Sequence, residues 1–126
     1  MSTRTNAGLT VAARRLNRSG ADAAFTYIAT GAGSTAEGTS QTALVTENTA
    51  NGSARATATC TQENTGDSKW VRNFNFTGNV TVREIGIFNA SSGGTMLLRH
   101  VLASNRDYVN GQSLEITITN TTSRGA

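Results

Sequence analysis

The sequence contains no proline, a single cysteine (Cys60) and no apolar run long enough to span a bilayer. One cysteine excludes an internal disulfide framework, so packing or assembly must stabilise the fold. The N-terminus lacks the apolar core of a signal peptide, so we expect synthesis and assembly in a cytoplasm without membrane contact. Proline commonly protects edge strands, and edges that pair with neighbouring subunits would not need that protection.

The sequence has few charged residues, and its basic residues are almost all arginine. The chain has 11 basic and 8 acidic residues, for a net charge of +3, and every basic residue except Lys69 is an arginine, a residue typical of protein interfaces. Only Arg14 and Arg15 are adjacent, and no aromatic residues alternate with the arginines, so no nucleic-acid groove is expected. The dispersed carboxylates, one histidine and one cysteine predict no metal site and no other cofactor.

The densest apolar stretch, Val80–Ala103, predicts two strands folded into a hairpin around a glycine-rich turn. In the first strand the apolar residues change parity at Arg83. A β-bulge there would restore one common face. The alternative is a strand buried on both faces, and the adjacent Leu97 and Leu98 in the second strand favour it.

Four other segments alternate in polarity or are rich in β-branched and aromatic residues, which predicts further strands. These are Phe25–Thr30, Ser53–Thr61, Lys69–Phe76 and Leu114–Thr119. Strands and helices do not alternate along the sequence as in β-α-β folds. The pattern therefore predicts an all-β fold, an antiparallel β-sandwich or barrel-like domain with a short N-terminal helix or arm. We assign residues 1–20 to the arm and 21–126 to one β-domain, in which Cys60 is expected to be a core thiol.

The N-terminal arm contains a helical pattern that starts after a polar stretch. Asn6 is expected to be the N-cap, and arginines occupy the last turn, where positive charge suits the helix dipole. A narrow apolar stripe, which would need a surface to lie on, is formed by Leu9, Ala12, Ala13 and Leu16. The alternative is a disordered arm that orders only on a neighbouring subunit.

Two stretches, Met1–Arg18 and the loop Gly31–Gly52, have too little apolar content to fold on themselves. Ordering such segments is unfavourable unless an interface compensates for the lost entropy, so we expect them to carry the intermolecular contacts. The candidate interface residues, as partners for acidic groups on a neighbouring coat protein, are Arg4, Arg14, Arg15 and Arg18. The alternative is a mobile, solvated tail and loop.

The sequence contains little that indicates an enzyme. The segment Gly31–Ala36 matches the dinucleotide-binding pattern G-x-G-x-x-A after a predicted strand, but no helical period and no second β-α-β half follow. A nucleotide-binding enzyme is therefore only a remote alternative. His100 lies within an apolar strand without an accompanying nucleophile motif, so we expect an interior or interface side chain and no catalytic residue.

Three segments together resemble a family of small structural proteins of tailed bacteriophage virions. They are YIATGAGSTAEGTSQTALVTE, WVRNFNFTGNVTVREIGIFNASSGGTMLLRHVL and VNGQSLEITITNT. Such proteins typically show a YIA-x-G-x-G loop leading to T-x-L, an E-x-G-(I/L)-F-N-A-x-x-G-G-T-M-L-x-R hairpin and a terminal V-x-x-G-x-x-L-x-(I/V)-T strand. The resemblance covers roughly residues 6–120, and its most specific part is the hairpin motif Glu84–Arg99.

The resemblance implies a non-enzymatic virion component, assembled in the host cytoplasm, and carries no catalytic residues. A single domain of this size is what a capsid decoration, or cement, protein looks like, so we expect it to bind the outer surface of the major capsid protein shell. Family members are commonly tail or tail-fibre proteins, and a tail, baseplate or tail-fibre role is the alternative. The expected partners are the major capsid protein or other virion proteins, and further copies of the chain in a dimer or trimer.

Overall fold

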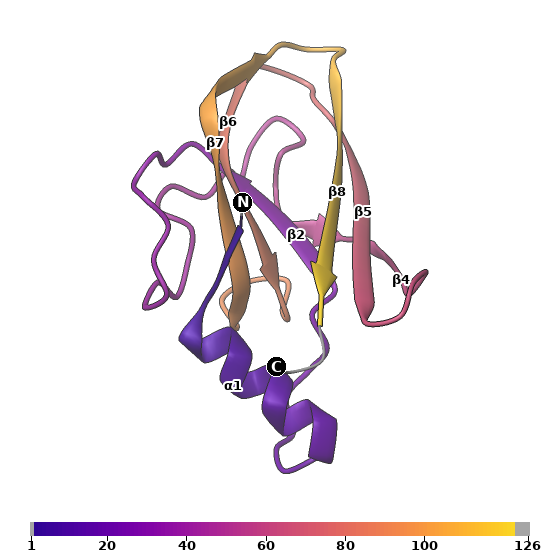
Figure 1. The fold of residues 1–126 in the computed structure, drawn as a ribbon. Coiled ribbons are helices and arrows are strands. Elements are labelled where there is room, and N and C mark those ends of the chain that lie inside the picture. The colour runs from indigo at the N-terminus through magenta and orange to yellow at the C-terminus, as the bar shows by residue number, and fades with distance from the viewer. Residues whose placement is uncertain (1, 123–126) are drawn as a thin grey trace.

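Two antiparallel β-sheets face each other, and one helix crosses an end of the molecule (Figure 1). The computed structural model describes residues 2–122. Along the chain the elements are β1 (Ser2–Arg4), α1 (Asn6–Asn17), β2 (Tyr27–Gly31), β3 (Ala56–Thr57), β4 (Thr59–Thr61), β5 (Asp67–Asn75), β6 (Val80–Phe88), β7 (Met96–Tyr108) and β8 (Ser113–Thr121). One sheet has the order β1-β7-β6-β2-β3 and the other β4-β5-β8, which confirms the all-β fold.

The two sheets join where β3 passes into β4. Only Ala58 separates these strands, so the predicted strand Ser53–Thr61 is bent at this residue and contributes to both sheets. β4 is the outer strand of its sheet, and this explains why Cys60, although paired with the buried Trp70, is exposed. The expectation that Cys60 is a core thiol was wrong, because strand parity alone does not reveal an uncovered edge.

A single apolar cluster fills the space between the sheets. Its buried members are Ile28, Trp70, Phe74, Phe76, Val80, Val82, Ile85, Ile87, Leu97, Leu98 and Ile116. Of its aromatic residues, Trp70 and Phe74 belong to β5 and Phe76 directly follows it, and the Trp70 indole N–H donates to the carbonyl of Phe25 at 2.7 Å. Both sheets therefore share one core, which lies in the position that strand alternation predicts.

A β-bulge resolves the change of parity in β6. Val82 pairs with Arg106 but Glu84 pairs with Val101, so the register shifts between them. The shift returns the apolar side chains on both sides of Arg83 to the common core, as the bulge interpretation requires. The opposite face of this strand is also buried from residue 84 to 88, so the two-sided burial favoured from the sequence is present as well.

The loop between β2 and β3 covers that opposite face. Leu44 from the loop packs with Ala29, Phe88 and Met96 in a second, smaller apolar cluster. The loop follows the five-stranded sheet closely, with Glu47 forming an isolated bridge to Gly31. The loop thus finds an apolar partner surface on β2, β6 and β7 of its own chain, and the expectation that it carries intermolecular contacts stays a prediction.

The helix α1 rests on β7 through a different face from the one predicted. Its N-cap is Thr5, whose hydroxyl accepts a hydrogen bond from the Gly8 N–H at 2.8 Å, so Asn6 is the first helical residue. Gly8 and Val11 are its buried residues, and a Cβ at Gly8 would lie 2.6 Å from the Leu97 Cα. Only glycine permits this close approach. No helix within residues 2–122 is long and apolar enough to cross a membrane.

Candidate functional site: the α1 end and the anchored loop

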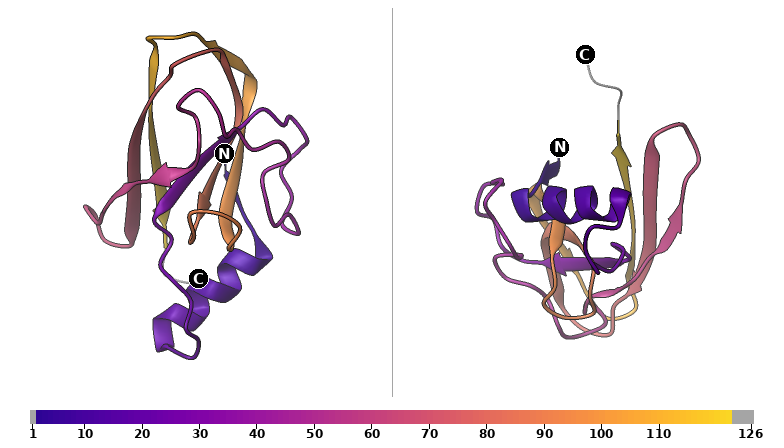
Figure 2. Two further views of the ribbon diagram at one scale, coloured as in Figure 1. Left: turned by 180° about the vertical axis from the view of Figure 1, so that it is seen from behind. Right: turned by 90° about the horizontal axis from the view of Figure 1, so that it is seen from below.

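The predicted interface arginines lie at the end of the molecule crossed by α1, which Figure 2 shows from below. Arg4 is exposed on β1, Arg14 and Arg15 are in the last turn of α1, and Arg18 is the exposed C-cap in the left-handed conformation, with φ 57°. The structure thus brings these residues to the helical end of the fold.

Arg14 is engaged within its own chain. Its Nε and Nη2 donate to the two carboxylate oxygens of Asp22 at 2.7 and 2.9 Å, and Arg15 donates to the backbone carbonyl of the same residue. The hydrogen bond from Arg14 holds the pKa of the Asp22 carboxyl below its usual value. These contacts engage both Arg14 and Arg15 and tie the segment after the helix to its last turn, so Arg18 is the better placed of the helical arginines to meet a partner.

The apolar stripe of α1 faces solvent. Leu16 is 89% exposed and Leu9 is 47% exposed, and Ala13 between them is exposed as well. The stripe predicted from the sequence exists, but the interior contact is made by Gly8 and Val11 instead. Exposed apolar residues gathered on one helix face commonly mark an interaction surface. We name Leu9, Ala13, Leu16 and Arg18 the α1 surface.

A buried ion pair anchors the loop between β2 and β3, residues 32–55, which we call the anchored loop. Glu84 and Arg99, both with 0% exposed side chains, are joined by a 2.8 Å contact between Arg99 Nε and Glu84 Oε1. The Glu84 carboxylate also accepts backbone N–H groups from Gly33 at 2.9 Å, Val45 at 2.9 Å and Thr46 at 2.8 Å. One carboxylate therefore fastens both limbs of the loop to the strand β6.

Electrostatics keep this carboxylate charged. Burial alone raises the pKa of Glu84, but the hydrogen bonds from Thr46, Arg99, Val45 and Gly33 outweigh burial and hold the pKa below its usual value. Arg99 extends the anchor, because its Nη1 donates to the Thr35 carbonyl at 2.7 Å. The two ends of the hairpin motif quoted above thus meet as one ion pair.

Glu37 fastens the loop to the edge of the five-stranded sheet. Its carboxylate accepts from the Thr3 hydroxyl at 2.7 Å and from the Val101 N–H at 2.8 Å, and its Oε2 lies 3.6 Å from His100 Nδ1. Burial raises the pKa of Glu37, but these hydrogen bonds hold it below the usual value. His100 is half-buried at this edge, as expected for an interior or interface side chain.

Sequence reasoning missed Arg55, which secures the hairpin turn. Its guanidinium lies 3.6 Å over the Phe88 ring and pairs with both carboxylate oxygens of Glu47, at 2.7 and 3.0 Å. It also donates to the carbonyls of Ala90 and Gly93 at 2.9 and 2.8 Å. No local sequence pattern predicts these contacts, since the partners come from two separate parts of the sequence, Glu47 and residues 88–93.

The glycine-rich segment after β2 serves packing and forms no phosphate cradle. A Cβ at Gly31 or Gly33 would lie 2.5 or 2.6 Å from Glu84 Oε2, and the Gly33 N–H is already used by that carboxylate. An internal carboxylate therefore occupies the place that a phosphate would take in a nucleotide-binding loop. Within residues 2–122, no three His, Cys, Asp or Glu side chains lie close enough to hold a metal ion.

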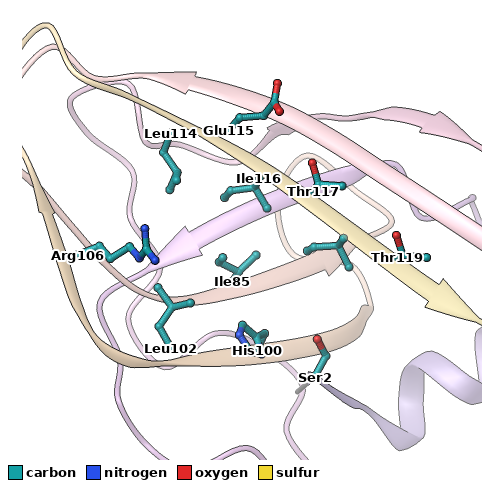
Figure 3. Close-up of a pocket in the computed structure, with 11 residues that line it drawn as sticks. Ser2, Ile85, His100, Leu102, Arg106, Leu114, Glu115, Ile116, Thr117 and Thr119 are labelled. Carbon is teal, nitrogen blue, oxygen red and sulfur yellow. The ribbon is translucent and has the colours of Figure 1, made fainter.

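A groove of about 410 Å³ runs between β7 and β8 (Figure 3). Its apolar lining includes Ile85, Leu102 and Ile116, and His100 and Arg106 border it on the β7 side. The two sheets are joined through β3 and β4 on one side, and this groove marks the opposite side, where β8 ends its sheet.

Comparison with known proteins identifies the family. The sequence model of the family described as Podophage GP4 fiber I protein gp80 matches residues 7–124, which include α1 from its second residue, all strands after it and the anchored loop. No curated protein matches the chain. Since the match spans nearly the whole chain, the protein belongs to the podophage GP4 fiber I protein gp80 family and is a structural component of a bacteriophage virion.

Proposed function

We propose that this protein is a building block of a podophage fibre and attaches to a neighbouring virion protein through the α1 surface. The family match carries the first part, because its description names a fibre protein. It favours the tail-fibre alternative over the capsid decoration role that the sequence analysis put first.

The arrangement of the chain supports the second part. Glu84, Glu37 and Arg55 hold parts of the anchored loop, β1 and the hairpin turn to the rest of the same chain. The α1 surface, by contrast, leaves the Leu9 and Leu16 side chains in solvent, and the exposed Arg18 follows at the end of the same helix. A partner that offers an apolar patch bordered by carboxylates would complement both features.

Location and copy number test the fibre role directly. Purified virions labelled with an antibody against the protein should carry label on fibres, and quantitative mass spectrometry should give at most a few dozen copies per virion. Hundreds of copies with label distributed over the capsid would overturn the proposal in favour of decoration.

The α1 surface is tested by a pair of exposed apolar residues. Leu16→Ser should reduce incorporation into virions severalfold without changing the melting temperature, because an exposed side chain contributes little to folding. Val109→Ser is the matched control, since Val109 is 53% exposed and lies between β7 and β8, outside α1. Equal incorporation of the two variants would show that attachment uses another surface.

Charge reversal supplies a second readout for the same surface. Arg18→Glu should weaken incorporation most strongly at low ionic strength, where attraction between exposed charges is least screened. Arg14 and Arg15 are unsuitable for this experiment, because replacing either would also remove a contact to Asp22. An incorporation defect that does not depend on salt would contradict an acidic partner surface.

A further inference from the structure

The strand β8 is a long edge without the usual protection against pairing. It has nine residues, its register with β5 is unbroken, and it bonds to no other strand within residues 2–122. Glu115 is its one charged residue, and the sequence has no proline to interrupt it. Edge strands of this length normally carry a bulge, a proline or inward charges that prevent association.

The ladder with β5 shows which backbone groups are available. Bonds from the Phe76 N–H to the Gln112 carbonyl and from the Thr122 N–H to the Gly66 carbonyl frame the strand pair. Hydrogen-bonded positions alternate in an antiparallel pair, so the even-numbered residues of β8 bond to β5. The odd-numbered residues, with Thr117 at the centre, therefore direct their N–H and C=O groups to the open edge.

A groove with both apolar and polar lining residues lies beside this edge. In Figure 3 Leu114 and Ile116 of β8 point toward Ile85 and Leu102, whereas Thr117 points to the opposite side. A strand added next to β8 would cover the groove with its inward side chains, because side chains of neighbouring strands alternate in the same way. The occupant should therefore be an extended segment with apolar residues at alternate positions.

We propose that this occupant is β8 of a second copy, paired antiparallel with Thr117 opposite its counterpart. The sequence of β8, SLEITITNT, suits this register: all nine residues overlap, Ile116 faces Ile118 of the other copy, and Glu115 faces Thr119. Centring the pair on Glu115 instead would place two carboxylates opposite each other, which is destabilising. The contact is isologous, with the same strand used by both copies. It is independent of the proposed fibre role, because it describes only how two copies of this chain bind each other.

The first test is the mass of the purified full-length chain by light scattering. The wild type should give twice the 13.1 kDa of one chain, and Thr117→Pro should give a folded monomer. The proline removes an N–H that points to the open edge and leaves the ladder with β5 intact. Thr117→Val, which keeps the N–H, is the matched control and should remain dimeric. A monomeric wild type, a trimer or a folded dimeric Thr117→Pro would overturn the proposal.

A second test covers the case in which the proline variant fails to fold. In a Cys60→Ser background, a short bifunctional thiol reagent should crosslink Thr117→Cys with itself. Glu115→Cys alone should not crosslink, because its two copies lie about 14 Å apart along the strands. A mixture of Glu115→Cys and Thr119→Cys chains should crosslink again. Efficient self-crosslinking of Glu115→Cys, or none at Thr117→Cys, would exclude this register.

Discussion

The Glu84 carboxylate connects several separate segments of the chain, because it links β6 to β7 through Arg99 and accepts hydrogen bonds from both limbs of the anchored loop. We predict that Glu84→Gln lowers the free energy of unfolding by about 3 to 5 kcal/mol, because it leaves the buried Arg99 without a charge partner. Urea unfolding followed by circular dichroism measures the loss.

Glu63→Gln is the matched control for that substitution. Glu63 is 55% exposed and pairs with Lys69 at 3.3 Å, so removing its charge should change stability by less than about 1 kcal/mol. If both variants lost the same small amount, the buried pair would be worth no more than a surface pair, and the loop would be held by its apolar contacts instead.

Acid should destabilise the fold through Glu84 and Glu37. The pKa of each is below the ordinary value of 4.5 in the folded chain, so folding favours the charged carboxylates. Their contribution is complete above about pH 5 and is lost as the pH falls below 4.5 toward the lower folded-state pKa values. Melting temperatures between pH 6 and pH 3 should fall steeply for the wild type. The curve for Glu84→Gln should be flatter, and an equally steep curve would place the effect on other carboxylates.

At the scale of elements, strict alternation was the most reliable signal. It located β5 and β8 to within two residues and gave the inward faces of both. The bulge in β6 was one of two interpretations of a parity change, and the structure contains it. The sequence could not show which face of α1 is buried, because that depends on a backbone contact at Gly8 with a strand far along the chain.

The anchored loop shows the same limit more strongly. Taken locally, Gly31–Gly52 is polar and short of apolar residues, and the local sequence therefore gives no sign of what orders it within the chain. Its ordering comes from Glu84 and Arg99, more than thirty residues away, and neither was recognised as an ion pair from the sequence. Polar contacts between residues far apart in the sequence produce no periodic pattern. The contacts of Arg55 could therefore not be predicted from the sequence either.

The start of α1 gives a prediction at this scale. Thr5 is buried, caps the helix at the Gly8 N–H and donates its hydroxyl to the Met96 carbonyl. Thr5→Ala should cost about 2 kcal/mol of unfolding free energy, since it removes a cap and leaves a buried carbonyl without its donor. Thr10→Ala, on the exposed face of the same helix, should cost much less. Equal costs would show that the cap is dispensable.

For the whole molecule, the shared core decides how it unfolds. The fold class followed from the sequence because strand alternation and turn residues are local signals. The placement in the virion did not, because capsid and fibre components draw on the same β-domain composition. What unites the two sheets is the cluster to which β5 and β8 contribute from one side and β2, β6 and β7 from the other.

We therefore predict one cooperative unfolding transition, reported equally from both sheets. Trp70 is the only tryptophan and belongs to β5, so its fluorescence follows the three-stranded sheet, while far-ultraviolet circular dichroism follows all strands. Ile87 lies fully buried in β6 of the other sheet, and Ile87→Ala should cost about 2 to 5 kcal/mol. Because the core is shared, this substitution should lower the urea midpoints of both signals by the same amount. A fluorescence midpoint that stays at its wild-type value while the circular dichroism midpoint falls would show that the sheets unfold separately.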